Sequence, residues 1–267
     1  MEIMLENISY DILKNINYKF REGSITSIIG RSGSGKSLLG LLLMNMISNY
    51  DGKIIVNNRI DYDIYDYLRK VGYVSQMADK HFVCELVKDE ISFGLRQYNY
   101  KLDKEEKQIK DSLKMVGLSD AYLDRNVTSL SASEKVKVAI ASSLVMNPEV
   151  LLLDNVTTYL DSDSKKELLN LLLKLKDKFN KSIIFISSDM DFVYSLGNDY
   201  ILLNDGKIVK SGSVLDFLID DDMFNRYDLE IPKIIRLIKL MFINKKVDLN
   251  KIKNVDDIVR EVINKNG

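Results

Sequence analysis

Short apolar runs separated by polar turns divide most of the chain into predicted strands and helices. Runs rich in β-branched residues predict strands, and apolar residues spaced three or four apart predict helices. The expected strands cover residues 3–8, 15–20, 24–29, 53–57, 71–75, 150–153, 182–187, 200–204 and 207–210. The expected helices follow Leu38, cover 85–116 with a polar break near Asn99, and cover 164–179.

The alternation of these strands and helices predicts an α/β fold whose sheet is largely parallel and covered on both faces. The strand pattern ends near Gly212, and short helical runs with a charged tail follow it. We therefore expect one large domain over residues 1–212 and a small C-terminal helical appendage over residues 213–267.

Charge and composition narrow the possible classes of function. The 267 residues include 38 basic and 39 acidic side chains, a net charge of -1, which gives no electrostatic basis for non-specific nucleic-acid binding. Cys84 and His81 are the only residues of their types, which excludes disulfides and Cys- or His-rich metal sites. No apolar run reaches the ~18 residues that span a membrane, and the first residues lack the basic segment of a signal peptide. We expect a cytosolic chain that reaches the membrane only through a partner.

The segment GRSGSGKS at residues 30–37 predicts a site for ATP and Mg²⁺. It fits the pattern G-x-x-x-x-G-K-[ST] between an expected strand and an expected helix, the context in which this loop binds phosphate. Gly33 and Gly35 would take positive φ, so that backbone N–H groups and the helix N-terminus face the anion. Lys36 would reach the β- and γ-phosphates, and the Ser37 hydroxyl would coordinate Mg²⁺. The expected ATP-binding residues of the loop are Gly30, Ser32, Gly33, Ser34, Gly35, Lys36 and Ser37.

A second predicted ligand for the metal lies far along the chain. The apolar run at residues 150–153 predicts a buried strand, and Asp154 follows it directly. A carboxylate at the carboxyl end of a parallel strand lies where such sheets bind ligands, so Asp154 would hold Mg²⁺ through water. Each feature alone has an ordinary alternative, a Gly/Ser-rich turn for the loop and an acidic turn for Asp154. Their occurrence together favours nucleotide binding.

Further motifs identify a family. After the loop come GYVSQ, which ends at Gln76, and TSLSASEKVKVAIASSLVMNPEVLLLDNVTTYLDSDS, which begins at Thr128. With the phosphate loop, these resemble the Q-loop, signature, Walker B and D-loop of the ATP-binding cassette (ABC) ATPases. The resemblance implies a P-loop NTPase cassette with N-terminal antiparallel strands and a helical subdomain at about residues 77–148. It also implies that Gln76 is a catalytic residue and Mg²⁺ ligand, and that Ser131 and Asp161 contact nucleotide.

Two further stretches resemble the ATPases of energy-coupling factor transporters. They are HFVCELVKDEISFGLRQYN at residues 81–99 and LEIPKIIRLIKLM at residues 229–241. The resemblance implies a peripheral protein at the cytoplasmic face of the cell membrane, in an importer of a vitamin or a metal ion. Its partners would be a second ABC ATPase, a transmembrane coupling subunit and a substrate-binding membrane protein, with no nucleic acid. It also implies head-to-tail dimers, in which each ATP lies between one chain's phosphate loop and the other chain's signature.

The chain departs from the family pattern where water is activated. Asn155 stands where the family has a glutamate after the Walker B aspartate, and Ser188 stands where it has the switch histidine. A neutral amide orients a water but cannot take its proton, and loss of a general base costs ~10²–10⁴ in rate. A serine is also too short to span to the γ-phosphate. We therefore expect ATP binding with weak or no hydrolysis at this chain's own site.

The signature is altered as well. Ala132 and Ser133 replace its two glycines, and their Cβ atoms would crowd a backbone that approaches phosphate. Glu134 and Lys137, where the family has Gln and Arg, are milder changes. Because both halves of each homodimeric site would then be altered, the pattern favours a heterodimer with a catalytically intact relative. Tyr10 is a candidate for stacking on adenine, and a core tyrosine is the alternative.

Three classes of function remain open on these observations. The leading hypothesis is the ATP-binding subunit of an energy-coupling factor importer, driven by ATP-dependent dimer closure. The alternative is a non-hydrolytic, ATP-responsive scaffold or regulatory ABC protein. A soluble ABC ATPase of translation or DNA repair is disfavoured, since the chain has neither two cassettes nor a long coiled coil. Residues 85–96 would form either a surface for the transmembrane partner or a helix packed on its own domain, and residues 231–242 either a dimer contact or a helix folded back.

Overall fold

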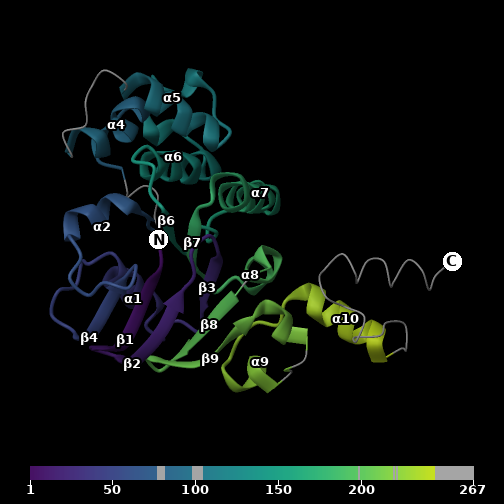
Figure 1. Cartoon of the computed structure of the whole chain (residues 1–267). Coiled ribbons are helices and arrows are strands. Elements are labelled where there is room, and N and C mark those ends of the chain that lie inside the picture. Colours follow the sequence, from purple (N-terminus) through teal and green to yellow (C-terminus); the bar gives the residue numbers. More distant parts are fainter. Residues whose placement is uncertain (77–81, 98–104, 198, 219, 221, 244–267) are drawn as a thin grey trace.

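Two β-sheets and the helices around them make up the structure, a computed structural model that describes residues 1–76, 82–97, 105–197, 199–218, 220 and 222–243 (Figure 1). The strands are β1 (Ile3–Tyr10), β2 (Leu13–Phe20), β3 (Ile25–Ile29), β4 (Asp51–Val56), β5 (Val71–Val74), β6 (Val150–Asp154), β7 (Ser182–Ile186), β8 (Asp199–Asn204) and β9 (Lys207–Ser213). The 3-stranded sheet, β2-β1-β4, is antiparallel. The 6-stranded sheet, β5-β6-β7-β3-β8-β9, is parallel except for β9. These sheets confirm the predicted α/β fold with a mostly parallel core and antiparallel N-terminal strands.

The helices that the structure describes are α1 (Lys36–Leu43), α2 (Ile64–Lys70), α4 (Val87–Gln97), α5 (Glu105–Met115), α6 (Ala132–Leu144), α7 (Ser162–Phe179), α8 (Met190–Leu196), α9 (Asp222–Arg226) and α10 (Lys233–Ile243), with 3₁₀ turns η2 (Asp120–Tyr122), η3 (Val127–Ser129) and η4 (Val214–Leu218). Helices α1, α2, α6, α7 and α8 contact strands of the parallel sheet, and α9 and α10 follow its last strand in the chain. Helices α4, α5 and α6 gather at the top of Figure 1, away from the strands of the antiparallel sheet. They lie within the predicted helical subdomain, whose limits remain a prediction.

The parallel sheet separates two hydrophobic cores, because successive side chains of a strand point to opposite faces. On β6, Leu151 and Leu153 pack into the core that includes helices α4 to α8, whereas Leu152 packs into the core that includes α1 and the antiparallel sheet. All five residues of β6 are buried. Burial on both faces explains why this strand reads as a continuous apolar run rather than an alternating one.

Side-chain caps set several helix ends that hydrophobic periodicity does not locate. Helix α7 begins two residues before its predicted start, because the Asp161 carboxylate accepts a hydrogen bond from the Ser164 N–H at 2.8 Å. Asn180 ends the helix in the left-handed conformation, with φ of 49°. The pattern does not predict α2 and α8, which have 7 residues each and are too short for a periodic signal.

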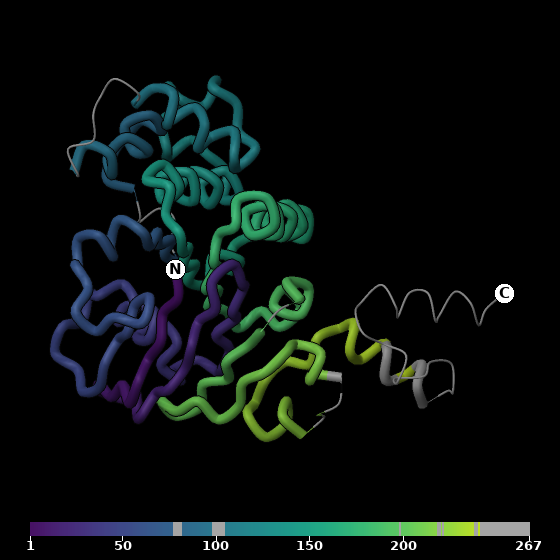
Figure 2. Tube along the Cα trace, viewed as in Figure 1, coloured from purple at the N-terminus to yellow at the C-terminus, as the bar shows by residue number. Residues whose placement is uncertain are grey.

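The C-terminal segment is anchored to the sheet by aromatic rings. Tyr200 of β8 lies 4.8 Å from Phe217 between ring centroids, and Phe217 lies 5.5 Å from Phe224 of α9. Helix α10 projects to the side of the domain, as the tube in Figure 2 shows. Its Ile235 is fully buried, whereas Leu237 is 52% exposed. The burial of Ile235 fits the alternative in which this segment folds back on the domain, and the side chains of Ile238, Met241 and Phe242 lie outside the described residues.

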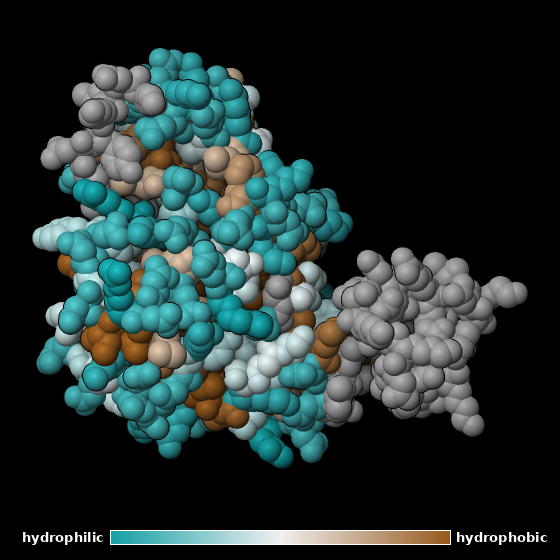
Figure 3. All heavy atoms as spheres, in the orientation of Figure 1, coloured by the Kyte–Doolittle hydropathy of each residue, from teal (hydrophilic) through white to brown (hydrophobic). Residues whose placement is uncertain are grey.

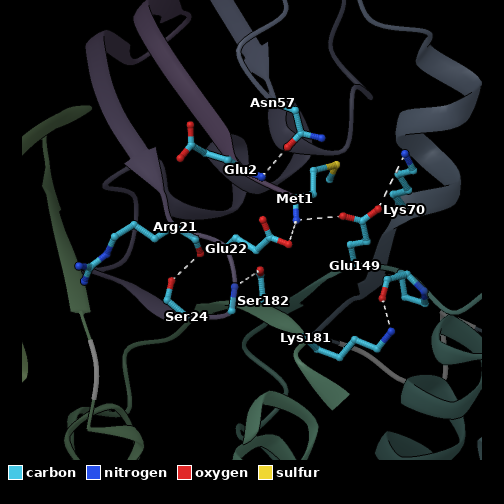
Figure 4. A network of polar contacts seen from close by, with 12 residues as sticks. Met1, Glu2, Arg21, Glu22, Ser24, Asn57, Lys70, Glu149, Lys181 and Ser182 are labelled. Atoms are coloured by element: carbon cyan, nitrogen blue, oxygen red, sulfur yellow. Dashed lines mark hydrogen bonds and ion pairs between the residues drawn. The ribbon is translucent and has the colours of Figure 1, made fainter. Parts of the chain in front are cut away.

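Polar contacts tie together the ends of the parallel strands opposite the phosphate loop (Figure 4). The Glu149 carboxylate, just before β6, forms ion pairs with the Met1 amine at 2.9 Å and with the Lys70 ammonium at 3.8 Å. Lys181, just before β7, donates to the Asn147 side chain at 2.6 Å and to the Pro148 carbonyl at 2.7 Å. These contacts pair the charged groups at the strand ends, and Met1 and Lys70 also line a separate cavity of about 410 Å³.

Hydrophilic side chains cover most of the face in Figure 3, and hydrophobic residues appear there in small separate patches. Within the part of the chain that the structure describes, no helix is both long and apolar enough to cross a membrane.

Candidate nucleotide-binding site

The carboxyl ends of four parallel strands meet at one edge of the sheet and position the candidate site. Gly30 follows β3, Gln76 follows β5, Asp154 ends β6 and Ser188 follows β7. Open α/β sheets bind ligands at this edge. A cavity of about 420 Å³ opens here, within the ~300–1,000 Å³ typical of small-molecule sites. Its lining residues are Ile12, Ser32, Gly33, Gly35, Lys36, Ser37, Leu38, Gln76, Asn155, Thr158 and Ser188.

The phosphate loop has the backbone that its sequence predicts. Gly33 and Gly35 adopt positive φ of 79° and 102°, and helix α1 begins directly after Gly35. A Cβ on Gly33 would meet no atom within 4 Å, so the loop leaves open space on the side of that residue. A Cβ on Gly30 would lie 2.2 Å from the Leu203 carbonyl oxygen, so Gly30 is required where the loop passes close to β8. The loop therefore presents a cradle of main chain beside the N-terminus of α1.

Two polar groups of this loop lack a charged hydrogen-bond partner among the described residues. The Ser34 hydroxyl is buried and has no hydrogen-bond partner among the described residues. The Lys36 ammonium donates to the carbonyl oxygens of Gly30 at 2.6 Å and Arg31 at 2.8 Å, both within the loop itself. A phosphate would give the loop N–H groups and Lys36 a charged acceptor in place of those neutral carbonyls.

Lys36 and Asp154 form the charged centre of the site, and burial acts on both. Burial lowers the pKa of Lys36, and the nearby Asp154 carboxylate partly offsets that shift. Burial raises the pKa of Asp154, and hydrogen bonds from Ser37 and Asn155, with the charge of Lys36, partly offset it. A divalent cation would favour the ionised carboxylate by supplying the missing positive charge. Ser37, Gln76 and Asp154 remain the predicted residues for holding Mg²⁺; Ser37 and Gln76 line the cavity, and Ser37 hydrogen-bonds Asp154.

Asn155 is turned toward the metal-site carboxylate. Its side-chain amide donates to Asp154 Oδ1 at 2.8 Å, and its backbone N–H donates to the Ile186 carbonyl at 2.8 Å. The residue has a positive φ of 51°, a conformation that asparagine tolerates better than most residues. Ser188 lines the same cavity with an exposed side chain. Neither an amide nor a hydroxyl is a general base at neutral pH, so the two predicted water-activating positions hold polar groups that cannot take a proton from water.

Four predicted nucleotide contacts, Gly30, Ser34, Ser131 and Asp161, are not among the residues that line this cavity. Ser131 and Asp161 instead cap helices α6 and α7 with their side chains, and both are exposed. Their contact with a nucleotide held by a partner chain remains a prediction. Tyr10, the candidate for adenine stacking, is half-buried against the core beneath the antiparallel sheet, as the alternative interpretation has it.

The sequence interpretation missed three residues that line the cavity, namely Ile12, Leu38 and Thr158. Ile12 lies in the short turn between β1 and β2, and its backbone carbonyl is close to Gly206 of the β8–β9 turn. Thr158 donates its hydroxyl to the Asn155 carbonyl at 2.8 Å, which places it beside the site. Ile12 reaches the site through a tertiary contact that no local pattern signals, whereas the three-residue spacing of Thr158 from Asn155 offers a weak signal of proximity.

Comparisons with known proteins agree with this geometry. A family model described as ABC transporter matches residues 13–158. The chain is 35% identical over 222 residues to the energy-coupling factor transporter ATP-binding protein EcfA of Pediococcus pentosaceus, covering 82% of this chain and 79% of that protein. The structure is similar to CbiO1 of Clostridium perfringens, part of the ABC transporter complex CbiONQ, with a TM-score of 0.76, 28% identity and coverage of 89% and 98%. It is also similar to the ATP-binding cassette MJ0796, a dimer in a post-hydrolysis state bound to ADP and Pi, with a TM-score of 0.69, 26% identity and coverage of 79% and 98%.

Proposed function

This chain belongs to the ABC transporter family of ATP-binding proteins, and we propose that it is the ATP-binding subunit of an energy-coupling factor importer with a weak or inactive catalytic site of its own. One observation carries the proposal: the cavity unites the phosphate loop and Gln76 with Asn155 and Ser188 at the water-activating positions. The groups that bind nucleotide and metal are present, and the proton acceptors are absent from those two positions.

Several features support the assembly in which this subunit would act. The similarity to EcfA extends over most of both chains, and that to CbiO1 points to a protein whose complex includes further subunits. We propose that the chain pairs with a second, catalytically intact ABC ATPase, and that this pair docks on a transmembrane coupling subunit beside a substrate-binding membrane protein. The chain would then lie at the cytoplasmic face of the membrane and take part in uptake of a vitamin or a metal ion. Residues 1–212 would be the ATP-binding domain and residues 213–267 the appendage.

In this proposal, different residues bind the phosphates and the metal, and their binding energy drives closure of the dimer. The loop N–H groups and Lys36 would hold the phosphates, and the Ser37 hydroxyl, Gln76 and Asp154 would hold Mg²⁺. The metal, when bound, neutralises phosphate charge. Binding energy at this site favours closure of the dimer, and hydrolysis at the partner's site allows it to reopen. Asn155 orients a water without taking its proton, so ATP persists here.

A repair experiment in the assembled complex tests this proposal. Complex purified from membranes that contain the Asn155→Glu/Ser188→His variant should turn over ATP at least twofold faster than wild type, because a second site gains a base and a switch residue. The matched control Asn155→Gln/Ser188→His keeps a neutral amide and should not gain. Unchanged turnover in the repaired variant, with normal assembly and unfolding midpoint, would show that these positions do not limit the site.

A non-hydrolytic scaffold or regulator is the second candidate, and the altered signature favours it alongside Asn155 and Ser188. Co-purification of the tagged chain distinguishes the two. A membrane complex with ATP turnover supports the importer, whereas a soluble partner without turnover in any assembly supports the scaffold. Tight binding of RNA or DNA at physiological salt would instead favour the third class, a soluble ABC ATPase of translation or DNA repair.

A further inference from the structure

The two-residue turn between β8 and β9 joins two segments that border the candidate nucleotide cavity. Asp205 and Gly206 form this turn, and both have positive φ, at 47° and 76°, as a type I′ hairpin requires. The Gly206 N–H donates to the Ser34 carbonyl of the phosphate loop at 3.2 Å. The Gly206 carbonyl accepts from the Lys14 N–H, just after the β1–β2 turn, at 2.8 Å. The backbone of one residue therefore connects the phosphate loop to the β1–β2 turn.

The close approach at Gly206 leaves no room for a side chain. A Cβ there would overlap the Ile12 carbonyl oxygen and lie 2.6 Å from the Ile12 carbonyl carbon, although Cβ atoms essentially never come within 3.0 Å of another heavy atom. Both atoms belong to the backbone, which cannot turn aside as the end of a flexible side chain can. Any side chain at this position would therefore force the two turns apart.

The β8–β9 turn is held on the side of the phosphate loop. The Leu203 carbonyl oxygen lies against Gly30, where an added Cβ would also clash. Arg31 of the loop pairs with Asp205 at 3.1 Å, and β8 is hydrogen-bonded to β3, the strand that leads into the loop. Separation of the two turns should therefore displace the β1–β2 turn, and Ile12 with it.

Ile12 contributes an apolar part of the cavity wall. Its side chain is 39% exposed and lines the cavity, and its Cδ1 lies 3.4 Å from where a Cβ on Gly35 would be. The backbone donors of the loop and the Lys36 ammonium suit phosphate, whereas an aliphatic side chain offers an anion no partner. Ile12 suits the uncharged base and sugar of a nucleotide, because apolar walls bind the apolar parts of ligands.

We propose that Gly206 is a positioning residue for nucleotide binding, which holds Ile12 at the distance from the phosphate loop that lets it contact the base and sugar. The proposal rests on the proposed function, which supplies the nucleotide. Gly206 acts through Ile12 and does not itself touch the ligand. Loss of the close approach should weaken binding of a nucleotide and spare a ligand that consists of phosphates alone.

Titration calorimetry of the full chain with Mg-ATP and with Mg-tripolyphosphate separates these two contributions. Wild type, Gly206→Ala, Ile12→Ala and the double variant are compared. Gly117→Ala is the matched control, because Gly117 has a positive φ of 79° and an added Cβ there would meet no atom within 4 Å. It therefore introduces similar backbone strain without the clash.

Gly206→Ala and Ile12→Ala should each weaken Mg-ATP binding by about fivefold, the size expected when part of an aliphatic contact is lost, and change tripolyphosphate binding by less than about twofold. The double variant should bind Mg-ATP no more weakly than the weaker single variant, because both changes remove the same contact. Gly117→Ala should leave both affinities unchanged. Equal losses for the two ligands, or additive losses in the double variant, would overturn the proposal.

Hydrogen exchange of the wild-type chain supplies a second measurement that needs no variant to fold. The Lys14 N–H, bonded to the Gly206 carbonyl, should exchange several-fold more slowly with saturating Mg-ATP than with saturating Mg-tripolyphosphate, because only the nucleotide would hold the β1–β2 turn in place. Equal protection by both ligands would overturn the proposal. Phosphate release in the same samples reports separately on the proposed function, since brisk hydrolysis by wild type would contradict that function and not the positioning.

Discussion

At the scale of single residues, the candidate site buries two charged groups, Lys36 and Asp154, whose charged forms are disfavoured by burial. Asp154 is 5% exposed and Lys36 is 7% exposed, and burial shifts the pKa of each toward its neutral form. The attraction between the two charges and the hydrogen bond from Ser37 only partly offset the effect of burial on the pKa of Asp154. Without Mg-ATP, the site should therefore reduce the stability of the chain, as functional sites often do.

The Asp154→Asn variant should be more stable than wild type in the absence of nucleotide, by on the order of 1 kcal/mol at neutral pH. The folded-state pKa of Asp154 is raised, so at a pH between its unfolded and folded pKa the folded chain keeps a proton that the unfolded chain has lost. The stabilising contribution of protonated Asp154 is present below the ordinary carboxyl pKa, and it is lost as the pH rises through the raised pKa of the folded chain. The advantage of the variant should thus shrink on acidification to about pH 4. Denaturant midpoints across this range measure it, and a less stable variant at neutral pH would contradict the assignment.

At the scale of elements, helix α4 shows how one internal carboxylate organises a neighbouring segment. Glu90 is 2% exposed, and its Oε2 accepts from the N–H groups of Val83 and Cys84, each at 2.9 Å. The Ser142 hydroxyl of α6 donates to the Glu90 carbonyl at 3.1 Å. The apolar face of α4 packs on its own domain, so that alternative for residues 85–96 accounts for one face of the helix. A role of the exposed face of residues 85–96, which includes Phe93, in binding a transmembrane partner remains a prediction.

Replacement of Glu90 by alanine should destabilise the chain by about 2–4 kcal/mol, because two partly buried N–H groups lose their acceptor and a cavity forms. Glu90→Gln is the matched control, since a single amide oxygen can still accept both hydrogen bonds, and it should cost much less. Chemical denaturation measures the difference, and amide hydrogen exchange at Val83 and Cys84 localises it. Equal stability of the two variants would show that these hydrogen bonds do not hold the segment.

Helix caps also show what local sequence can and cannot predict. The S-x-x-E spacing of Ser131 and Glu134 is a recognised signal for a helix start, and the capping box forms as that spacing allows. The contact of Glu134 with Tyr122 joins η2 to α6, and no pattern within either element predicts it. Periodicity locates the long helices and buried strands, whereas short capped helices such as α2 depend on a single side chain, here Asp63.

At the scale of the whole molecule, the parallel sheet makes the site predictable. Strands that run in the same direction bring the residues after β3, β5, β6 and β7 to one edge, so Lys36, Gln76 and Asn155 meet although they are far apart in the chain. Strand order and the placement of β4 in the antiparallel sheet depend on long-range pairing that local patterns do not encode. Ile12 could not be predicted for the same reason. The turn that carries it reaches the cavity only in the folded chain.

The claim that ATP binding is retained while hydrolysis is lost can be tested on one preparation of the isolated chain. Mg-ATP binding is measured by titration calorimetry and phosphate release is measured in the same buffer, for wild type and Lys36→Ala. The account predicts saturable binding by wild type, at least tenfold weaker binding by Lys36→Ala, and phosphate release by wild type barely above background. Brisk phosphate release by wild type that disappears in Lys36→Ala would contradict it, because this chain's own site would then be catalytically competent.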